Sequence, residues 1–273
     1  MPVELGMIAG AVVFVLIIII LVGRWMTGSE LEKNIKNLFS SSTNISDKVY
    51  SSEQTRDLPD PVQRYFKYSL RENQHYISNA RLKHGGKFNP GQKWFSIQGE
   101  EYFTIKNPGF VWFGKVPFLS ARDMYYDGKG YMKVKLLSII KIIDAKGKEL
   151  DQGALIRWLS EAPWFPTALL PSEKLRWEPI GNDSARVIFT DKDLTVDGVF
   201  YFNERGQITN FSAKRYGNKD MEKWSVTYRD YKEIGGMQIP HHAEATWNPK
   251  SGDLTYAKFT LDKVEYNNPS RFK

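Results

Sequence analysis

The chain has 273 residues, no cysteine and a formal net charge of +7, from 38 Lys and Arg against 31 Asp and Glu. Without cysteine it can form neither a disulfide framework nor a cysteine-ligated zinc site, and it cannot carry a lipid on a cysteine. The basic residues are interspersed with acidic ones and do not cluster on one helix, so nucleic acid is not an expected partner.

The first element in the chain is an apolar run, Leu5–Gly23, of 19 residues without a charge. As a helix it would extend over roughly 28 Å, close to the ~30 Å hydrocarbon core of a bilayer. Arg24 and Trp25 follow at once and suit the headgroup level. The run predicts a single transmembrane helix, with the bilayer as a partner.

A cleaved signal peptide is the alternative to a permanent anchor. Signal peptides have a basic start and an apolar core of about 7–15 residues. Here Met1–Glu4 contains no Lys or Arg and the run is longer, which favours an uncleaved single-pass anchor in the cell membrane. Arg24, Lys33 and Lys36 beyond the run favour a cytoplasmic domain, but large domains can cross regardless of such a bias, so the side stays open.

The next segment places Leu31, Ile35 and Leu38 on one stripe, which predicts a short amphipathic extension of the anchor. The polar stretch Ser40–Ser52 is typical of a linker. About 245 residues remain after the anchor, enough for one large β domain or two small ones. We therefore expect a transmembrane anchor in 1–27, a juxtamembrane helix and linker in 28–54, and a β-rich soluble domain in 55–273.

The soluble domain is predicted to open with a helix. Asp60 is a suitable N-cap, Pro61 suits the first helical position, and Gln63 completes a capping pattern. One face of this helix carries Val62, Tyr65, Phe66 and Ser69 and is expected to pack on a sheet.

From Ser78 onward the sequence is typical of strands separated by turns that contain Gly, Asn or Asp. Short turns between successive strands imply an antiparallel meander. The expected strands are Asn79–Gly86, Trp94–Ile105, Phe110–Pro117, Ala121–Tyr126, Tyr131–Ile143, Lys174–Ile180, Ala185–Thr190, Leu194–Asn203, Ile208–Tyr216, Lys223–Ile234, Gln238–Asn248 and Leu254–Tyr266.

Three stretches of these strands are apolar on both faces: Phe110–Phe113, Leu136–Ile143 and Val199–Phe202. A strand of this kind needs a cover on its second face or a closed barrel around it.

One helix interrupts the strands. Asp151–Ala162 has helical spacing of its apolar residues with Asp151 as N-cap, and it leads into the apolar, aromatic connection Pro163–Pro171. Because loops normally face water, this connection is expected to insert into something apolar. The domain's own interior, a ligand cavity and the bilayer surface all stay open.

The sequence contains no recognisable catalytic motif. His241 and His242 are neighbours on a strand and so point to opposite faces, as do Glu100 and Glu101, which argues against a metal site and a paired-carboxylate site. Glycine-rich nucleotide loops and nucleophile elbows do not occur. We expect no metal, no cofactor and no enzymatic activity.

Four stretches resemble an uncharacterised bacterial family of membrane-anchored proteins that contain a domain of unknown function: Leu58–Phe66, Ala121–Gly130, Trp158–Pro166 and Tyr231–Pro240. The last of them is also similar to the lipoprotein-carrier fold. That resemblance implies a curved antiparallel sheet wrapped as a half-open barrel, with helices covering an apolar cavity and Trp158–Pro171 in the cover. It also implies an extracytoplasmic domain. It supplies no catalytic residue.

Taken together, we expect a mainly β fold with a few helices that binds a lipid, lipoprotein or other apolar ligand beside the membrane. The candidate ligand-binding residues are Trp112, Phe113, Trp158, Trp164, Phe165 and Leu169. A structural subunit of an envelope complex and an enzyme with a dispersed site are the alternatives, and the oligomeric state stays open. A cavity of about 300 Å³ or more would favour binding, whereas convergent carboxylates or histidines would favour an enzyme.

Overall fold

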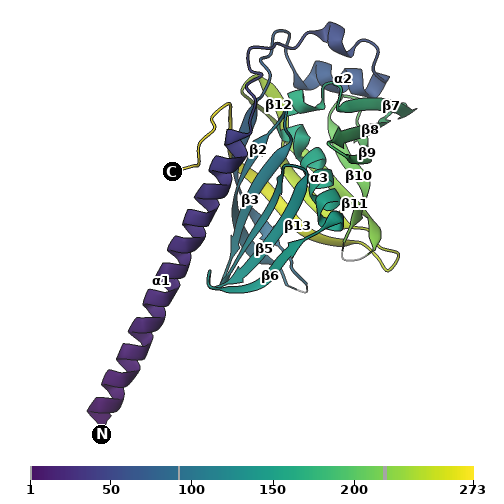
Figure 1. Cartoon of the computed structure of the whole chain (residues 1–273). Helices are drawn as coiled ribbons and strands as arrows, with labels where there is room; N and C mark the ends of the chain where they lie inside the picture. The colour runs from purple at the N-terminus through teal and green to yellow at the C-terminus, as the bar shows by residue number, and fades with distance from the viewer. Residues whose placement is uncertain (1, 92, 218–219) are drawn as a thin grey trace.

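A single antiparallel sheet of 13 strands organises the chain in the computed structural model, which describes residues 2–91, 93–217 and 220–273 (Figure 1). The mainly β, antiparallel fold is thereby confirmed. The strands are β1 (Asn79–Phe88), β2 (Phe95–Thr104), β3 (Gly109–Val116), β4 (Leu119–Tyr126), β5 (Lys129–Leu136), β6 (Ile140–Lys146), β7 (Leu175–Gly181), β8 (Ser184–Asp191), β9 (Leu194–Phe202), β10 (Ile208–Tyr216), β11 (Met221–Ile234), β12 (Met237–Trp247) and β13 (Leu254–Tyr266).

The sheet is curved and open rather than closed. Its order runs from β6 through β1 to the neighbouring β13 and on to β7, so its two edges, β6 and β7, are consecutive in the chain. The connection between these edges contains α3 (Lys148–Glu161), η2 (Ala162–Trp164) and η3 (Pro166–Leu169). Helix α3 contacts β3–β6 on one arm of the sheet and β9 and β10 on the other, and it lies between the two arms (Figure 1). The expected half-open barrel with a helical cover is therefore present.

Helix α1 (Pro2–Ser40) is continuous from the apolar run to the start of the domain. Leu31, Ile35 and Leu38 bury their side chains against Val111 and Phe113 on the outer face of the sheet. This contact explains why β3 is apolar on both faces, since Phe110 and Trp112 face the main core instead. The predicted amphipathic stripe is confirmed, and α1 is the cover that the second face requires.

The rest of α1 extends away from the domain (Figure 1). Among the described residues, the stretch Val13–Ser40 is long and apolar enough to cross a membrane, and most of its hydrophobic window is not buried in the protein.

Helix α2 (Asp60–Ser69) is preceded by η1 (Ser52–Thr55). It lies at one end of the sheet, where it contacts β12 and β8. The predicted apolar face is buried. Asp60 is not the N-cap, however, because Pro59 occupies that position and the Gln63 side chain donates to the carbonyl groups of Arg56 and Leu58 instead. The expected linker also contributes to the core, since Tyr50 is buried there.

The expected strand Tyr131–Ile143 is wrong in one respect, because it is two strands, β5 and β6. Leu137 and Ser138 have φ of 53° and 66° and form the turn between them. Two successive residues with left-handed backbone in a hairpin turn usually mark Gly or Asn, so the apolar sequence conceals the turn. The expected cover on the second face of this run is absent, since β6 and the turn are largely exposed.

Helix α3 begins before its predicted start. Its N-cap is Gly147, and Asp151 lies in the first turn, where Oδ1 accepts a 2.7 Å hydrogen bond from the backbone N of Gly130. The carboxylate therefore joins α3 to the start of β5 rather than capping its own helix. The apolar connection after α3 packs into the domain's own interior, with Phe165, Leu169 and Leu170 buried in the main core.

Candidate functional site

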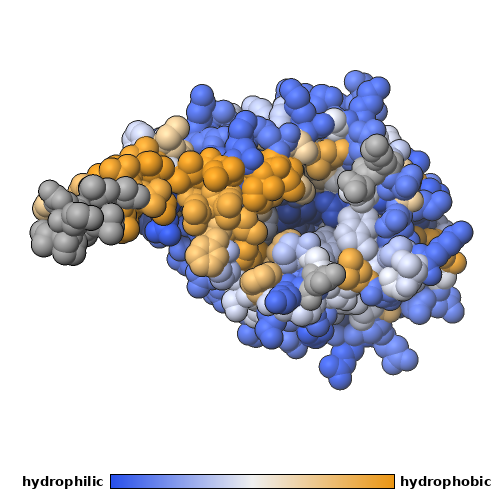
Figure 2. Space-filling model, turned by 90° about the horizontal axis from the view of Figure 1, so that it is seen from below, coloured by the Kyte–Doolittle hydropathy of each residue, from blue (hydrophilic) through white to orange (hydrophobic). Residues whose placement is uncertain are grey.

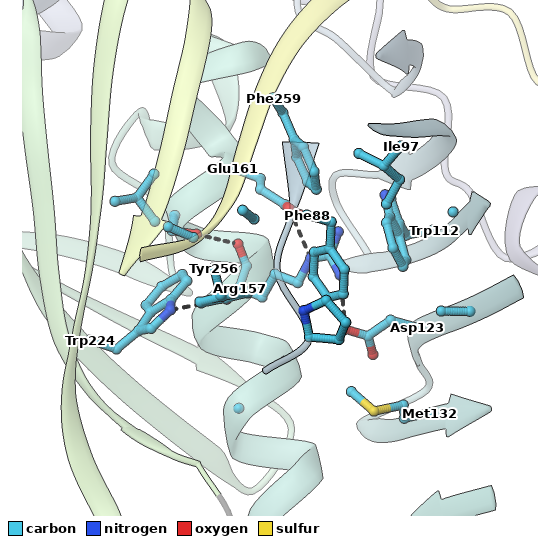
Figure 3. Close-up of a pocket in the computed structure, with 18 of the residues that line it drawn as sticks. Phe88, Ile97, Trp112, Asp123, Met132, Arg157, Glu161, Trp224, Tyr256 and Phe259 are labelled. Atoms are coloured by element: carbon cyan, nitrogen blue, oxygen red, sulfur yellow. Dashed lines mark hydrogen bonds and ion pairs between the residues drawn. The ribbon is translucent and has the colours of Figure 1, made fainter. Parts of the chain in front are cut away.

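A cleft of about 560 Å³ lies between α3 and the concave face of the sheet (Figure 3). Its volume exceeds the ~300 Å³ that separates a binding cavity from a packed core and lies within the ~300–1,000 Å³ typical of ligand pockets. Strands from both arms supply apolar side chains to its walls, among them Ile97, Trp112, Val134, Val226, Trp247 and Phe259.

Close approach of aromatic rings to the backbone shapes one wall. Trp112 Nε1 donates a buried 2.8 Å hydrogen bond to His84 Nε2, and the His84 ring stacks on Phe259 with centroids 4.0 Å apart. Gly99 and Gly114 are paired across β2 and β3, and a Cβ on either would lie within 2.3 Å of the His84 or Trp112 ring. Both glycines are therefore needed to make room for this pair. Burial lowers the pKa of His84 to about 3, so the imidazole is neutral at physiological pH.

Arg157 of α3 lines the cleft and bonds the acidic side chains beside it (Figure 3). Its Nε donates to Glu161 Oε1 at 2.8 Å, its Nη1 to Asp123 Oδ2 at 2.9 Å, and its Nη2 to Glu101 Oε1 at 2.8 Å. The guanidinium also lies over the rings of Phe110 and Trp112, 4.9 and 5.0 Å from their centroids. One side chain thus connects α3 to β2, β3 and β4.

Burial raises the pKa of both Glu101 and Glu161, against the opposing effect of Arg157. Two neighbouring buried acids therefore hold a proton more readily than free carboxyl groups do. Convergent carboxyl groups are what an enzyme with a dispersed site would need. Here the carboxyl groups of Glu101, Asp123 and Glu161 all bond the guanidinium of Arg157, which is the arrangement of an ion-pair network.

Some of the buried polar atoms of the cleft lack a hydrogen-bond partner among the described residues. These include Asp123 Oδ1, Glu161 Oε2 and Trp164 Nε1. Buried polar groups in proteins are almost always bonded. The three atoms are therefore candidates for contact with a ligand.

A second cation, Arg215 of β10, lies on the opposite wall. Its guanidinium is 4.7 Å from the Trp224 ring centroid, and its Nε donates to the carbonyl of Gly153 in α3 at 2.9 Å. The Trp224 indole donates to the Tyr256 hydroxyl at 3.1 Å (Figure 3). These bonds satisfy polar groups in the wall, where the guanidinium also lies over the ring of Trp247.

The mouth of the cleft lies near the turns between strands. Pro90 follows β1, Val116 and Leu119 flank the β3–β4 turn, and Ile142 and Ile143 follow the β5–β6 turn; all five line the cleft. Figure 2, which views the molecule from the side toward which α1 extends, shows a hollow with a hydrophilic floor beside an apolar surface. The cleft thus opens at the end of the domain from which the apolar part of α1 projects.

The structure brings only two of the six candidate residues to the cleft, Trp112 and Trp164. Phe113 points to the other face of β3 and packs under α1. The remaining three, Trp158, Phe165 and Leu169, are buried in the core and lie outside the cleft lining. Ligand binding by any of the six stays a prediction.

The sequence interpretation missed Glu101, Asp123, Arg157 and Glu161 as a group. It correctly placed Glu100 and Glu101 on opposite faces, since Glu100 bonds Tyr102 and Arg271 on the outer side. The partners of Glu101 come from β4 and α3, far away in the chain. The available signal was a charged residue, Arg157, between the apolar residues Leu155, Ile156, Trp158 and Leu159 of a helix.

Within the described parts of the chain, no group of three or more His, Asp or Glu side chains is placed to hold a metal ion. His241 contacts Lys232, whereas His242 contacts Arg229, Glu244 and Thr260.

A sequence model with the description "Family of unknown function (DUF6544)" matches residues 48–259. No curated protein matches the chain. The chain is similar in structure to a putative outer membrane lipoprotein-sorting protein domain from Vibrio parahaemolyticus, at 11% identity and a TM-score of 0.41, with 70% of this chain and 86% of that chain covered. It is also similar to a LolA superfamily protein from Nitrosomonas europaea, at 10% identity and a TM-score of 0.43, with 76% and 92% covered.

A DUF1329 family protein from Desulfovibrio piger is similar to the same extent, at 10% identity and a TM-score of 0.41, with 70% of this chain and 86% of that chain covered.

Proposed function

The chain belongs to the family of unknown function DUF6544, and we propose that it binds an apolar or amphipathic ligand, such as a lipid chain, in the cleft between α3 and the sheet. Helix α1 would hold the domain at a membrane while it does so. The single observation that carries the proposal is the apolar cleft of about 560 Å³ in the concave face of the sheet.

The chemistry of the lining supports this choice of ligand. Aromatic and aliphatic side chains from both arms of the sheet make up most of the wall. The charged residues of the lining are Arg157, Arg215, the acids Asp123 and Glu161, and Arg122, whose guanidinium pairs with Glu30 of α1. Removal of a long hydrocarbon chain from water is favourable by about 0.8 kcal/mol for each buried CH₂ group. A hydrocarbon chain along the walls with its polar end at the charged residues would satisfy both parts of the cleft.

The proposal is one of binding and not of catalysis. Glu101 is fully buried and lies outside the cleft lining, and each acid of the cluster already bonds Arg157. A general acid or base must be within hydrogen-bond reach of its substrate, which Glu101 in this arrangement is not.

The test is quenching of tryptophan fluorescence by a long-chain alcohol that carries bromine in its chain. Several tryptophans line the cleft, including Trp112 and Trp224, so a bound chain should quench them saturably in the full-length protein. Ala245→Phe, which adds a ring inside the cleft, should weaken binding about tenfold or more. Ser96→Phe is the matched control and should bind normally, because Ser96 is exposed and next to the cleft-lining Ile97 on β2, so it points to the opposite face of the sheet.

Non-saturable quenching that is equal in the two variants would contradict the proposal. A melting curve for each variant checks that Ala245→Phe has not unfolded the sheet.

A further inference from the structure

We propose that the unpartnered carboxyl oxygen of Asp123 in the cleft selects ligands whose polar head donates hydrogen bonds, an ammonium or a hydroxyl, over ligands with a carboxylate or phosphate head. This inference rests on the proposed function and names the class of ligand that the cleft prefers.

Arg157 leaves some carboxyl oxygens beside it without a hydrogen bond. It occupies Oδ2 of Asp123 and Oε1 of Glu161, but Asp123 Oδ1 and Glu161 Oε2 have no hydrogen-bond partner among the residues that the structure describes. The Asp123 side chain is only 7% exposed, and both residues line the cleft (Figure 3). Asp123 carries the inference, because burial raises the pKa of Glu161 and a protonated Glu161 can itself donate, whereas a carboxylate oxygen accepts hydrogen bonds and cannot donate them.

The surroundings make a donor head the fitting partner. The neighbouring guanidinium groups are already engaged, that of Arg157 by three carboxyl groups and that of Arg215 by the carbonyl of Gly153. A hydrogen bond to a charged group is also stronger where water is excluded. A carboxylate or phosphate head would instead bring a negative charge against Asp123. The hydrogen-bond donor Trp164 Nε1, also unpartnered among the described residues and also in the lining, suits the oxygen of a hydroxyl head.

The test compares four brominated ligands that share one long chain: an amine, an alcohol, a carboxylate and a hydrocarbon without a head. In the full-length protein the amine and the alcohol should bind about tenfold more tightly than the other two. Equal affinities for all four would overturn this inference and leave the proposed function intact. No binding of any of the four would overturn both.

Asp123→Asn sharpens the test. Arg157 would hold the amide oxygen, so the amide NH₂ would face the cleft and turn an acceptor into a donor. The preference should then shift from the amine toward the carboxylate. Asp191→Asn is the matched control, because Asp191 is equally buried and bonds Tyr125 and Lys174 but lies outside the cleft lining. A preference that changes equally in both variants would count against the role of Asp123.

A second inference comes from a different part of the molecule, the exposed surface beside α1. We infer that four residues at two neighbouring turns, Phe118, Leu137, Ile139 and Ile140, contact the bilayer that α1 enters. We call these four residues the apolar tip. Phe118 is 74% exposed and Ile140 is 57% exposed, and the other two are also exposed.

The apolar tip lies at the level where the apolar run of α1 ends. Thr27 Oγ1 donates to the carbonyl of Ser138 at 3.2 Å, and a Cβ at Gly23 would lie 2.6 Å from Cγ1 of Ile139. If Leu5–Gly23 spans the hydrocarbon core, the tip is held at the interface between hydrocarbon and headgroups. Trp25, 73% exposed, suits the same depth.

The surface is continuous. Figure 2 shows hydrophobic residues extending from α1 onto the adjoining surface of the domain, next to the hollow. An exposed apolar patch beside a membrane-spanning segment is the expected form of a membrane-contacting surface. Since Ile142 and Ile143 lie next to the tip and line the cleft, a lipid could pass from the bilayer into the cleft without crossing water.

The chain contains no cysteine, so single cysteines can be labelled cleanly with an environment-sensitive dye. Dyes at Phe118→Cys and Ile140→Cys in the full-length protein, reconstituted in phosphatidylcholine vesicles, should be quenched by nitroxide-bearing lipids. Ile180→Cys is the matched control, because Ile180 on β7 is also 56% exposed but distant in the sheet from the tip. Equal, weak quenching at all three positions would overturn the inference.

Discussion

Arg157 is the residue on which the arrangement of the cleft depends most directly. Its guanidinium bonds three carboxyl groups from β2, β4 and its own helix, and it lies on two aromatic rings. Because Glu101 and Asp123 are buried, both would lose their cationic partner without it. A buried network of this kind adds little stability over an apolar core, but it is costly to break.

Arg157→Met should therefore lower the free energy of unfolding by about 3–5 kcal/mol. Arg186→Met is the comparison, since Arg186 forms only exposed ion pairs with Glu178 and Asp197 and should cost less than about 1 kcal/mol. Urea denaturation at neutral pH measures both. Similar losses in the two variants would show that the cluster around Arg157 does not hold the fold together.

His84 makes the stability depend on pH. Burial lowers its pKa in the folded protein from 6.5 to about 3. Between these two pH values the unfolded chain therefore binds a proton at this histidine that the folded chain does not bind. This histidine should therefore make stability fall as the pH drops from 6.5 to 3, by up to about 1.4 kcal/mol per pH unit.

In His84→Gln this part of the slope should disappear, although the variant is less stable at neutral pH. Trp112→Phe serves as the control, because it removes the hydrogen bond but keeps the titrating ring. Urea denaturation between pH 3 and 7 measures the slopes. An unchanged slope in His84→Gln would contradict the assignment.

At the scale of elements, helix α1 has two parts with different surroundings. Its apolar part projects from the domain, whereas its last turns form the cover of β2 and β3. Glu30 binds this cover to the sheet through ion pairs with Arg122, Lys133 and Lys135. The element that is expected to enter the membrane is thus rigidly joined to the strands that line the cleft.

Glu30→Gln should loosen this join, because it leaves three cations on the outer face of β4 and β5 without their shared anion. Faster amide hydrogen exchange is expected in residues 28–40 and in the β5–β6 turn. Glu32→Gln is the control, since Glu32 forms only long ion pairs of 3.8 and 3.7 Å with Lys36 and Arg271. Unchanged exchange in Glu30→Gln would show that apolar packing alone holds the helix.

At the scale of the whole molecule, the chain is an open sheet whose edges, β6 and β7, are joined through α3 and whose interior is only partly filled. Helix α2 lies toward one end of the sheet, and the cleft lies toward the end near α1. A cleft, a projecting apolar helix and an exposed apolar tip at one end of the molecule form one surface suited to a bilayer.

Truncation separates the two roles of α1. A chain that starts at Arg24 should fold, bind the brominated alcohol and lose its membrane association, because the buried stripe begins at Leu31. A chain that starts at Ser41 exposes Val111 and Phe113 and should lose about 5 kcal/mol or more of stability, at roughly 1.5–3 kcal/mol for each buried aliphatic side chain lost. Melting curves and vesicle flotation measure the two effects. Equal stability of the two truncated chains would contradict this division.

The sequence by itself determined what depends on neighbouring residues. The apolar length of α1, its Leu31, Ile35 and Leu38 stripe and the alternation of most strands could be read from it because each is a periodic pattern within one segment. The β5–β6 turn could not, because Leu137 and Ser138 adopt left-handed backbone without a turn residue to mark it.

Only the tertiary structure decided the candidate site. Of the aromatic residues selected from the sequence, Trp112 reaches the cleft while Phe113 does not, since the sheet's curvature and the position of α1 determine which face is inside. The meeting of Glu101, Asp123 and Arg157 depends on pairing across β2, β3 and β4 and on the return of α3 into the concave face. Local sequence patterns specify the face of an element, but only the packing of distant elements specifies what that face meets.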